Sequence, residues 1–407
     1  MDTSLESKIN MMQEADPSWD SDTCDDWDGI PLVMGYYPEW VFDSFPPPKI
    51  DFERITWIDF AFVVPTEDSV VEFDSDDGPK ALRQLVSAAH ANGAKVKASI
   101  GGWSGSQYFS TAVQDEENRS TFIDSILSLY DDYHLDGIDI DWEYPGQKGM
   151  ENNLVNKRDT SNFLLFLKGL RKALPPSAKI SLAGQTTPFA DDDGNPSDDV
   201  SEFAEVVDWV LLMNYDVWGS SSNPGPNAPF FDACGNSTQP EASAVSAILA
   251  WMDAGFPACK LVLGLPSYGY ASKSKHQQLR TRSSKKGKAK SVQVVGEEDS
   301  EGQVQFKSLI EQGALVRSNL KSDSSDEQCV FLGAGGFQTL WDPCSETPFL
   351  VSKESKQIVT YDDPLSIGMK AAFARVMELR GVNLFDIHGD TSEWDLVDAI
   401  RAALFSV

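Results

Sequence analysis

Three carboxylates occupy alternating positions in the octet Asp-Gly-Ile-Asp-Ile-Asp-Trp-Glu at 136–143. Successive side chains of a β-strand point to opposite faces, so Asp139, Asp141 and Glu143 share one face, with neighbours about 6 to 7 Å apart. Negative charges this close repel one another, which raises the pKa of at least one of the three carboxyl groups. A carboxyl group that keeps its proton at neutral pH can act as a general acid. Glu143, the last residue of this carboxylate ladder, is the best placed to reach a substrate.

Other interpretations explain the carboxylate ladder less well. If these acidic residues were ordinary surface residues without a function, nothing would account for the desolvation cost of placing them on an apolar strand. A Ca²⁺ or Mg²⁺ site needs more oxygen ligands than the apolar flanking residues supply, so we predict no metal ion and no cofactor. Asp136 points to the other face of the strand and is interpreted as structural support. The histidines show no spacing typical of a triad or a metal site: His90, His134, His276 and His388.

Short apolar runs that alternate with amphipathic helical segments predict a parallel β/α fold around the ladder. A (β/α)₈ TIM barrel fits better than an open doubly wound sheet, because no Gly-rich phosphate turn follows the first run. The carboxyl ends of barrel strands carry catalytic residues, which suits Glu143. The predicted helices are 79–92, 115–134 and one that includes 163–170. The predicted strands are 32–37, 55–64, 95–100, 137–142, 179–183, 207–213, 261–265 and 382–387.

The interval between the seventh and eighth predicted strands is far longer than an ordinary β/α connection. We therefore predict an inserted α+β subdomain at 272–363, with its clearest strands at 333–341 and 357–362. The barrel is then formed by 31–271 together with 364–407.

Two segments have compositions that cannot bury enough apolar surface to fold by themselves. The basic, Ser-rich stretch 273–290 is expected to be a solvated flexible loop, with polyanion binding or nuclear targeting as the weaker alternatives. The acidic segment 1–30 is expected to be disordered.

The net charge of the chain limits the kinds of partner that it can bind. The chain has 33 basic and 63 acidic side chains, a formal charge of −30. Such a surface repels nucleic acid phosphates and anionic membranes, and no run of about 18 apolar residues could form a membrane span. We expect a monomer that binds neither nucleic acid nor membranes.

The octet resembles the Asp-x-x-Asp-x-Asp-x-Glu signature of glycoside hydrolase family 18, the chitinases and their relatives. Further segments resemble the family's other strand motifs in the same order, and the interval before Tyr361-Asp-Asp-Pro364 falls where many members carry a chitinase insertion domain. These segments are Gly35-Tyr-Tyr37, Ala61-Phe62, Lys97-Ala-Ser-Ile-Gly-Gly-Trp103, Leu212-Met-Asn-Tyr-Asp216 and Gly264-Leu-Pro-Ser-Tyr-Gly269.

The resemblance implies a retaining chitinase without a protein nucleophile, since the substrate's own N-acetyl oxygen attacks the anomeric carbon. Glu143 would protonate the leaving oxygen. Asp141 would hold the acetamido N–H and stabilise the oxazolinium ion, with Asp139 behind it sharing a proton. Tyr215 would donate its hydroxyl to the acetamido oxygen. A nearby carboxylate and a tethered nucleophile are sound physical means of lowering the barrier.

Sugar-binding residues are also implied, since the faces of pyranose rings are apolar. Each aromatic residue taken singly fits core packing at least as well, except Trp103, which follows Gly101-Gly102 on an expected loop. Phe385 stands where the family usually has a Trp, and Tyr270 replaces a frequent Arg. The implied binding residues are Tyr36, Phe62, Trp103, Met213, Asp216, Tyr268 and Phe385.

A chitooligosaccharide-binding lectin of the same fold is the main alternative, because function does not follow from fold. Such relatives typically lack the acid, whereas Glu143 is intact here. An endoglycosidase of N-glycan cores ranks lower, since it is usually built without the insertion.

The cellular location stays open. Residues 1–28 lack the basic start and apolar core of a signal peptide, whereas the family habit and the sequons at Asn118 and Asn236 favour export. The five cysteines allow at most two disulfide bonds, and Cys329 with Cys344 is the pair we expect.

Overall fold

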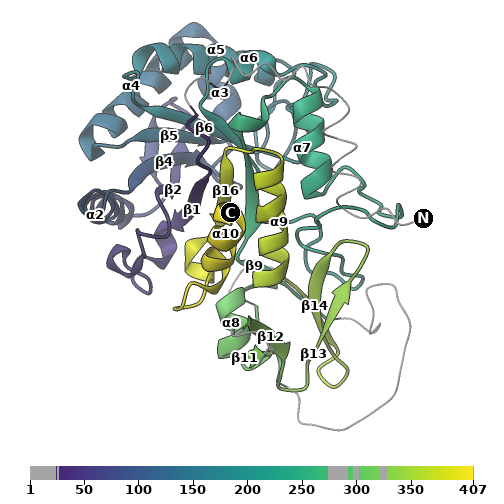
Figure 1. Ribbon diagram of the computed structural model, residues 1–407. Coiled ribbons are helices and arrows are strands. Elements are labelled where there is room, and N and C mark those ends of the chain that lie inside the picture. Colours follow the sequence, from purple (N-terminus) through teal and green to yellow (C-terminus); the bar gives the residue numbers. More distant parts are fainter. Residues whose placement is uncertain (1–23, 25–26, 274–291, 297–301, 321–327, 407) are drawn as a thin grey trace.

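Eight parallel strands form a closed barrel in the computed structural model, which describes residues 24, 27–273, 292–296, 302–320 and 328–406 (Figure 1). The strands follow the order β1-β16-β8-β7-β6-β5-β4-β2, and β2 pairs with β1 to close the barrel. Each predicted strand overlaps an observed one, which confirms the (β/α)₈ fold. The strands are β1 Leu32–Pro38, β2 Trp57–Pro65, β4 Lys95–Gly101, β5 Gly137–Asp141, β6 Lys179–Gly184, β7 Trp209–Leu212, β8 Leu261–Pro266 and β16 Gly381–Phe385, with the short β3 Val71–Phe73 antiparallel to β2.

Helices surround the barrel (Figure 1). The three predicted helices are present as α2, α4 and α5. Helix α4 begins where the Asp115 side chain accepts a hydrogen bond from the Asn118 N–H at 3.0 Å, and it ends at the left-handed His134. The α-helices are α2 Gly78–Ala91, α3 Phe109–Val113, α4 Glu116–Tyr133, α5 Asp159–Ala173, α6 Ser201–Ala204, α7 Ala244–Asp253, α9 Pro364–Val376 and α10 Asp395–Phe405. The 3₁₀ helices in the described barrel segments are η2 Glu39–Val41, η3 Pro47–Lys49, η4 Ala258–Lys260 and η5 Ile387–Gly389.

Strand β5 shows how the alternating sequence separates two environments. On the outer face, Trp142 stacks on Phe109 at 5.1 Å between ring centroids and meets Phe163 edge-on at 5.3 Å, which joins the strand to α3 and α5. The carboxylates Asp139 and Asp141 are on the other face, buried inside the barrel. The period of two therefore directs the aromatic residue to the helices and the acidic residues to the interior.

An α+β unit lies between β8 and α9 in the chain and next to the barrel, as predicted (Figure 1). It has a five-stranded antiparallel sheet of order β10-β9-β15-β14-β13 and a β11–β12 hairpin. The expected single strand 333–341 is wrong, because Gly335 and Gly336 have positive φ and make a turn between β12 and β13. The elements are β9 Tyr268–Lys273, β10 Gln303–Gln305, α8 Phe306–Glu311, β11 Leu315–Leu320, β12 Gln328–Gly333, β13 Gln338–Asp342, β14 Thr347–Ser352 and β15 Gln357–Thr360.

The exact division of the chain into barrel and insertion stays our proposal. Nearly all of the predicted basic loop at 273–290 and of the predicted disordered segment at 1–30 lies outside the described residues. No helix in the described part of the chain is both long enough and apolar enough to cross a membrane.

Two disulfide bonds are formed, Cys24–Cys259 and Cys234–Cys344. The expected Cys329–Cys344 pair is wrong, since Cys344 bonds to a cysteine in the segment between β7 and α7. The Ala233 N–H donates to the Cys344 carbonyl at 2.9 Å, and this contact brings the two backbones together. The two cysteines are 110 positions apart, and no local pattern indicates that they meet.

Candidate active site

The carboxyl ends of the barrel strands bring the predicted catalytic residues together, as a parallel barrel requires. Asp139 and Asp141 belong to β5, and Glu143 follows directly after it. Tyr215 comes just after β7, and Phe385 is the last residue of β16. Among the described residues, non-proline cis peptide bonds occur within β2 at Ala61-Phe62, after β5 at Glu143-Tyr144 and at the end of β16 at Phe385-Asp386.

Asp139 is the innermost carboxylate of the ladder and is 1% exposed. Its Oδ2 accepts hydrogen bonds from the Tyr36 hydroxyl at 3.0 Å and the Ser99 hydroxyl at 2.7 Å. The Ser181 hydroxyl donates to its Oδ1, and Lys97 Nζ lies 3.8 Å from the same oxygen. These groups come from three different strands, β1, β4 and β6, so the carboxylate is held in one orientation.

Asp141 is buried and differently surrounded. Burial raises its pKa well above the usual range, and the charges of Glu143, Asp139 and Asp59 raise it further. Its Oδ1 has no hydrogen-bond partner among the described residues. A buried carboxyl oxygen without a donor is suited to receive an N–H group from a ligand.

Glu143 is 9% exposed. Burial raises the pKa of its carboxyl to about 7, and the nearby charge of Asp216 adds to the rise, whereas a hydrogen bond from Tyr144 opposes it. The backbone is fixed on both sides, since the Glu143 N–H donates to Ser106 Oγ at 2.9 Å and Asn153 Nδ2 donates to its carbonyl at 2.8 Å. The site therefore holds an acid that exchanges its proton near neutral pH.

Tyr215 and Asp216 face the ladder from β7. Burial and the charges of Asp141 and Asp216 raise the pKa of Tyr215 well above its usual value, so its hydroxyl stays a hydrogen-bond donor. Asp216 has a left-handed backbone with φ 57°, and its N–H donates to Asn227 Oδ1 at 2.8 Å. Asn227 also donates from Nδ2 to the Tyr268 carbonyl at 2.9 Å. Sequence reasoning missed this amide, because Asn227 stands in no recognisable motif.

Aromatic rings form the floor beside these polar groups. Phe385 is central, with ring centroids 5.3 Å from Tyr36, 5.8 Å from Tyr215 and 6.2 Å from Tyr268. Tyr36 is 1% exposed and Tyr268 2% exposed, so both act mainly as packing and hydrogen-bonding partners, whereas Phe385 is half-buried. Met213, also half-buried, follows β7 and donates its N–H to the Gly184 carbonyl at 2.8 Å.

Exposed tryptophans extend the aromatic surface at one side. Trp103 is 53% exposed in the turn after β4, and its role as a sugar contact stays a prediction. Phe62 lies next to that turn. Its ring is so close to Gly102 that a side chain at that position would come within 2.8 Å of it. Trp40 is 62% exposed, with its ring 6.3 Å from Phe62. Sequence reasoning missed Trp40, because it stands among the aromatic and apolar residues of 36–42 and the sequence does not show that it is exposed.

Comparison with known proteins agrees with this geometry. The family model for glycosyl hydrolases family 18 matches residues 32–390. The chain belongs to glycosyl hydrolase family 18. A chitinase-like effector of Moniliophthora roreri is 36% identical over 92% of this chain and 93% of its own length, and one of Moniliophthora perniciosa is 34% identical over 91% and 86%. The crystal structure of a chitinase from Rhizomucor miehei is similar with a TM-score of 0.76 and 28% identity, over 91% of this chain and 99% of that one.

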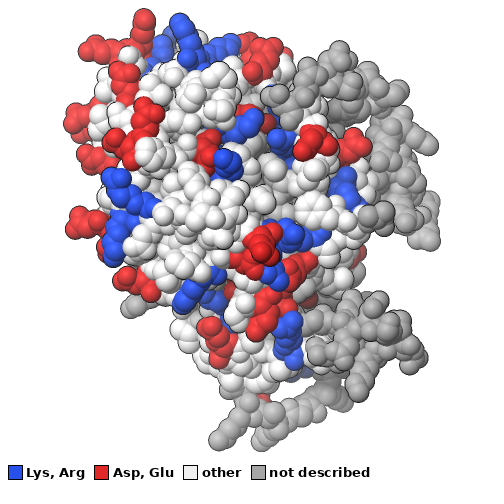
Figure 2. All heavy atoms as spheres, turned by 60° about the vertical axis from the view of Figure 1, so that its left-hand side comes forward, with Lys and Arg blue, Asp and Glu red and all other residues white. Residues whose placement is uncertain are grey.

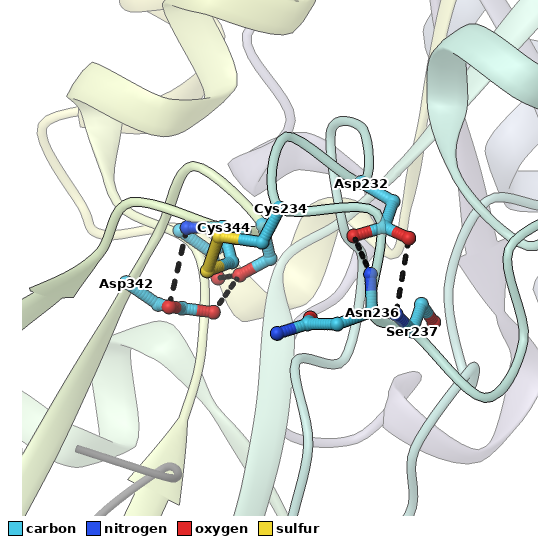
Figure 3. The surroundings of a disulfide bond; sticks show 8 residues. Asp232, Cys234, Asn236, Ser237, Asp342 and Cys344 are labelled. Atoms are coloured by element: carbon cyan, nitrogen blue, oxygen red, sulfur yellow. Dashed lines mark hydrogen bonds between the residues drawn. A yellow bond between two sulfur atoms is a disulfide. The ribbon is translucent and has the colours of Figure 1, made fainter.

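A cavity of about 290 Å³ is separate from the carboxylate ladder, and none of the ladder's residues lines it. Trp218, two positions after Asp216, lies on its wall, and the Cys234–Cys344 disulfide borders it. Asp232 shapes the adjoining loop by accepting hydrogen bonds from the N–H groups of Asn236 and Ser237 (Figure 3). We assign the chemistry to the ladder rather than to this cavity, because only the ladder combines buried acids with raised pKa values.

On the face shown in Figure 2, basic side chains lie among acidic ones and form no continuous basic area. Within the described ranges, no group of three or more His, Cys, Asp or Glu side chains could hold a metal ion.

Proposed function

We propose that this family 18 member is a chitinase that hydrolyses the β-1,4 bonds between N-acetylglucosamine units of chitin or chitooligosaccharides, with retention and with the substrate's N-acetyl group as nucleophile. The observation that carries the proposal is the pairing of two buried acids. Burial raises the pKa of Glu143 to about 7, and Asp141 next to it has a carboxyl oxygen without a hydrogen-bond donor among the described residues.

In the first step, the acetamido oxygen forms a bond to the anomeric carbon while the glycosidic C–O bond breaks. Glu143 transfers its proton to the leaving oxygen, which departs as a hydroxyl. The sugar becomes an oxazolinium ion. In the second step, water attacks the anomeric carbon, the ring opens to restore the acetamide, and the Glu143 carboxylate takes the proton from the water. Two inversions at one carbon give net retention, here without the protein nucleophile that most retaining glycosidases use.

Asp141 and Tyr215 would restrict the substrate to N-acetylated sugars. Asp141 Oδ1 would accept the acetamido N–H and stabilise the positive charge of the oxazolinium. The Tyr215 hydroxyl, which stays protonated, would donate to the acetamido oxygen and orient it. Deacetylated glucosamine provides neither the nucleophile nor these partners, so it would not be cleaved at this position.

Sugar binding would use the aromatic surface. Trp103 and Trp40 are exposed enough to stack on pyranose faces, and Phe385 would lie under the sugar at the reaction centre.

A chitooligosaccharide-binding protein without turnover is the second candidate. The names of the two Moniliophthora relatives, chitinase-like effectors, favour it, and so does the small Phe385 ring at the reaction centre. Intact Glu143 favours the enzyme.

Incubation with the chitin pentamer separates the two candidates. The wild type and Glu143→Gln are compared by mass spectrometry of the released sugars and by calorimetric binding, across pH 4 to 8. We expect shorter oligomers from the wild type alone and binding by both proteins. If the wild type binds the pentamer but releases nothing at any pH, the binding protein is the correct assignment.

A further inference from the structure

A lysine is buried inside the barrel beneath the carboxylate ladder. Lys97 on β4 is 0% exposed, and its Nζ lies 2.9 Å from Asp59 Oδ1 and 3.8 Å from Asp139 Oδ1. It also donates to the Ser181 hydroxyl, which in turn donates to Asp139. A buried ammonium is costly unless it is paired, so its position next to the ladder requires an explanation.

Asp59 on β2 completes the arrangement. It is the direct neighbour of Lys97 in the parallel register, and its Oδ2 accepts a hydrogen bond from Asn383 Nδ2 at 2.8 Å. Burial raises the pKa of Asp59 to about 6, Lys97 opposes that rise and Asp139 adds to it. Below the pair, the Trp209 ring lies 4.6 Å from Lys97 Nζ and separates the pair from the other end of the barrel.

We propose that Lys97 is a positioning residue for the ladder: together with Asp59, it holds Asp139 as a fixed negative acceptor and so places the shared proton on Asp141, on the side of the substrate. This deepens the proposed chitinase function and rests on it. The Lys97–Asp59 pair has almost no net charge, but its cation lies within ion-pair distance of Asp139, with Nζ 3.8 Å from Oδ1. The ladder therefore experiences an oriented dipole rather than an added charge.

Other titratable groups also act on the two inner carboxylates, Asp139 and Asp141. The dipole of the Lys97–Asp59 pair adds to their effects. Glu143 follows the same strand, Tyr36 comes from β1, Asp59 from β2 and Tyr215 from the end of β7, while Asp216 acts on Glu143 and Tyr215. All of these are carboxyls or phenols. Among the described groups that act on this pair, Lys97 is the cation in contact. Removing Lys97 should consequently shift the pH dependence of activity in one definite direction.

The test uses two substitutions that are predicted to act in opposite directions. Lys97→Met removes the positive end of the dipole, which disfavours the charged carboxylates and moves the acidic limb of the kcat/KM profile to higher pH by about one unit. Asp59→Asn leaves Lys97 with an uncompensated charge next to Asp139 and moves the same limb to lower pH. A purely structural role predicts loss of stability in both variants without opposite shifts.

A matched control is available in a second buried pair, Lys370 with Asp362, whose side chains are 0% and 1% exposed. Lys370→Met should lower the unfolding midpoint as Lys97→Met does but leave the acidic limb unmoved. The double variant Lys97→Met, Asp59→Asn removes both charges of the pair, so no unpaired charge is left inside the barrel. It replaces the single variants in the test if they fold poorly. Its limb should also move to higher pH, because the dipole is lost.

Shifts in the same direction, or no shift in well-folded variants, would overturn the role of Lys97. Wild-type turnover of the pentamer is measured first. Its absence contradicts the chitinase proposal alone. The variants are then compared by the pH dependence of pentamer binding, where the same opposite shifts are expected and equal profiles refute the inference.

Discussion

The hydroxyl of Tyr270 lies 2.6 Å from Oδ1 of Asp216 and donates a hydrogen bond to it. Tyr268 donates to the same oxygen at 2.7 Å, so two phenols share one acceptor. Tyr270 stands where the family frequently has an arginine, and it replaces a cation with a neutral donor. The carboxylate of Asp216 is thus oriented without being neutralised, and its charge continues to raise the pKa of Glu143.

Removing the Tyr270 hydroxyl should loosen Asp216 without removing it. We expect Tyr270→Phe to lower kcat/KM for the chitin pentamer by roughly tenfold, since a hydrogen bond to a charged group contributes about 1.5–3 kcal/mol and Tyr268 compensates for part of the loss. Steady-state kinetics of Tyr270→Phe and Tyr268→Phe provide the comparison. An unchanged kcat/KM in Tyr270→Phe would show that the contact has no role in turnover.

Activity should decline as pH rises through about 7. Glu143 must be protonated to act as the acid, and its pKa is about 7. A profile of kcat/KM between pH 4 and 9 gives the basic limb directly. If kcat/KM did not decline up to pH 9, the acid would be a group other than Glu143.

The raised pKa of Glu143 also predicts how stability depends on pH. The folded state binds this proton more tightly than the unfolded chain does, so its contribution is fully present below pH 4.5 and is lost as pH rises through about 7. Glu143→Gln avoids the loss. We expect this variant to exceed the wild type by up to about 3 kcal/mol in free energy of unfolding at pH 8 and to match it near pH 4. Urea unfolding at both pH values measures the difference, and equal curves at pH 8 would contradict the prediction.

The Cys234–Cys344 bond should stabilise the fold across a long separation. Its two cysteines are 110 positions apart, and closing a loop of that length restricts the unfolded chain strongly. Replacing both cysteines by serine should lower the free energy of unfolding by about 2–5 kcal/mol. Cys24→Ser with Cys259→Ser is the comparison, and since that bond joins residues 235 positions apart, the same argument predicts a loss at least as large. Equal denaturation curves for the Cys234, Cys344 double variant and the wild type would refute the expectation.

Sequence patterns predicted the strands and the ladder because both depend on a period of two. The desolvation argument applied to Asp139 also fits Asp59, between Ile58 and Phe60, and Lys97, between Val96 and Ala98. These two charges were nevertheless missed as a pair, because their contact depends on the register between β2 and β4. Register is set by packing across strands, and no single strand sequence states it.

Contacts made by loops were still harder to predict. Asn227 reaches Asp216 through a left-handed backbone, and Cys234 meets Cys344 across the junction with the insertion. Neither contact has a periodic signal, since both depend on how irregular segments fold over the barrel. The motifs therefore supplied the reacting groups that we propose, whereas the structure was needed for the residues that hold them.

Phe385 is the residue on which the rate of reaction should depend most visibly. It packs among Tyr36, Tyr215 and Tyr268, and it covers less area than the indole that the family usually has there. A larger ring under the reacting sugar offers more stacking surface, so Phe385→Trp should increase pentamer affinity or kcat by about three- to tenfold. Calorimetric binding and steady-state kinetics separate the two effects, with Phe385→Leu as the control that removes stacking. Were Phe385→Trp to weaken both binding and turnover, the three tyrosines would be fitted to the smaller ring, and Phe385 would be an adapted platform rather than a weakened one.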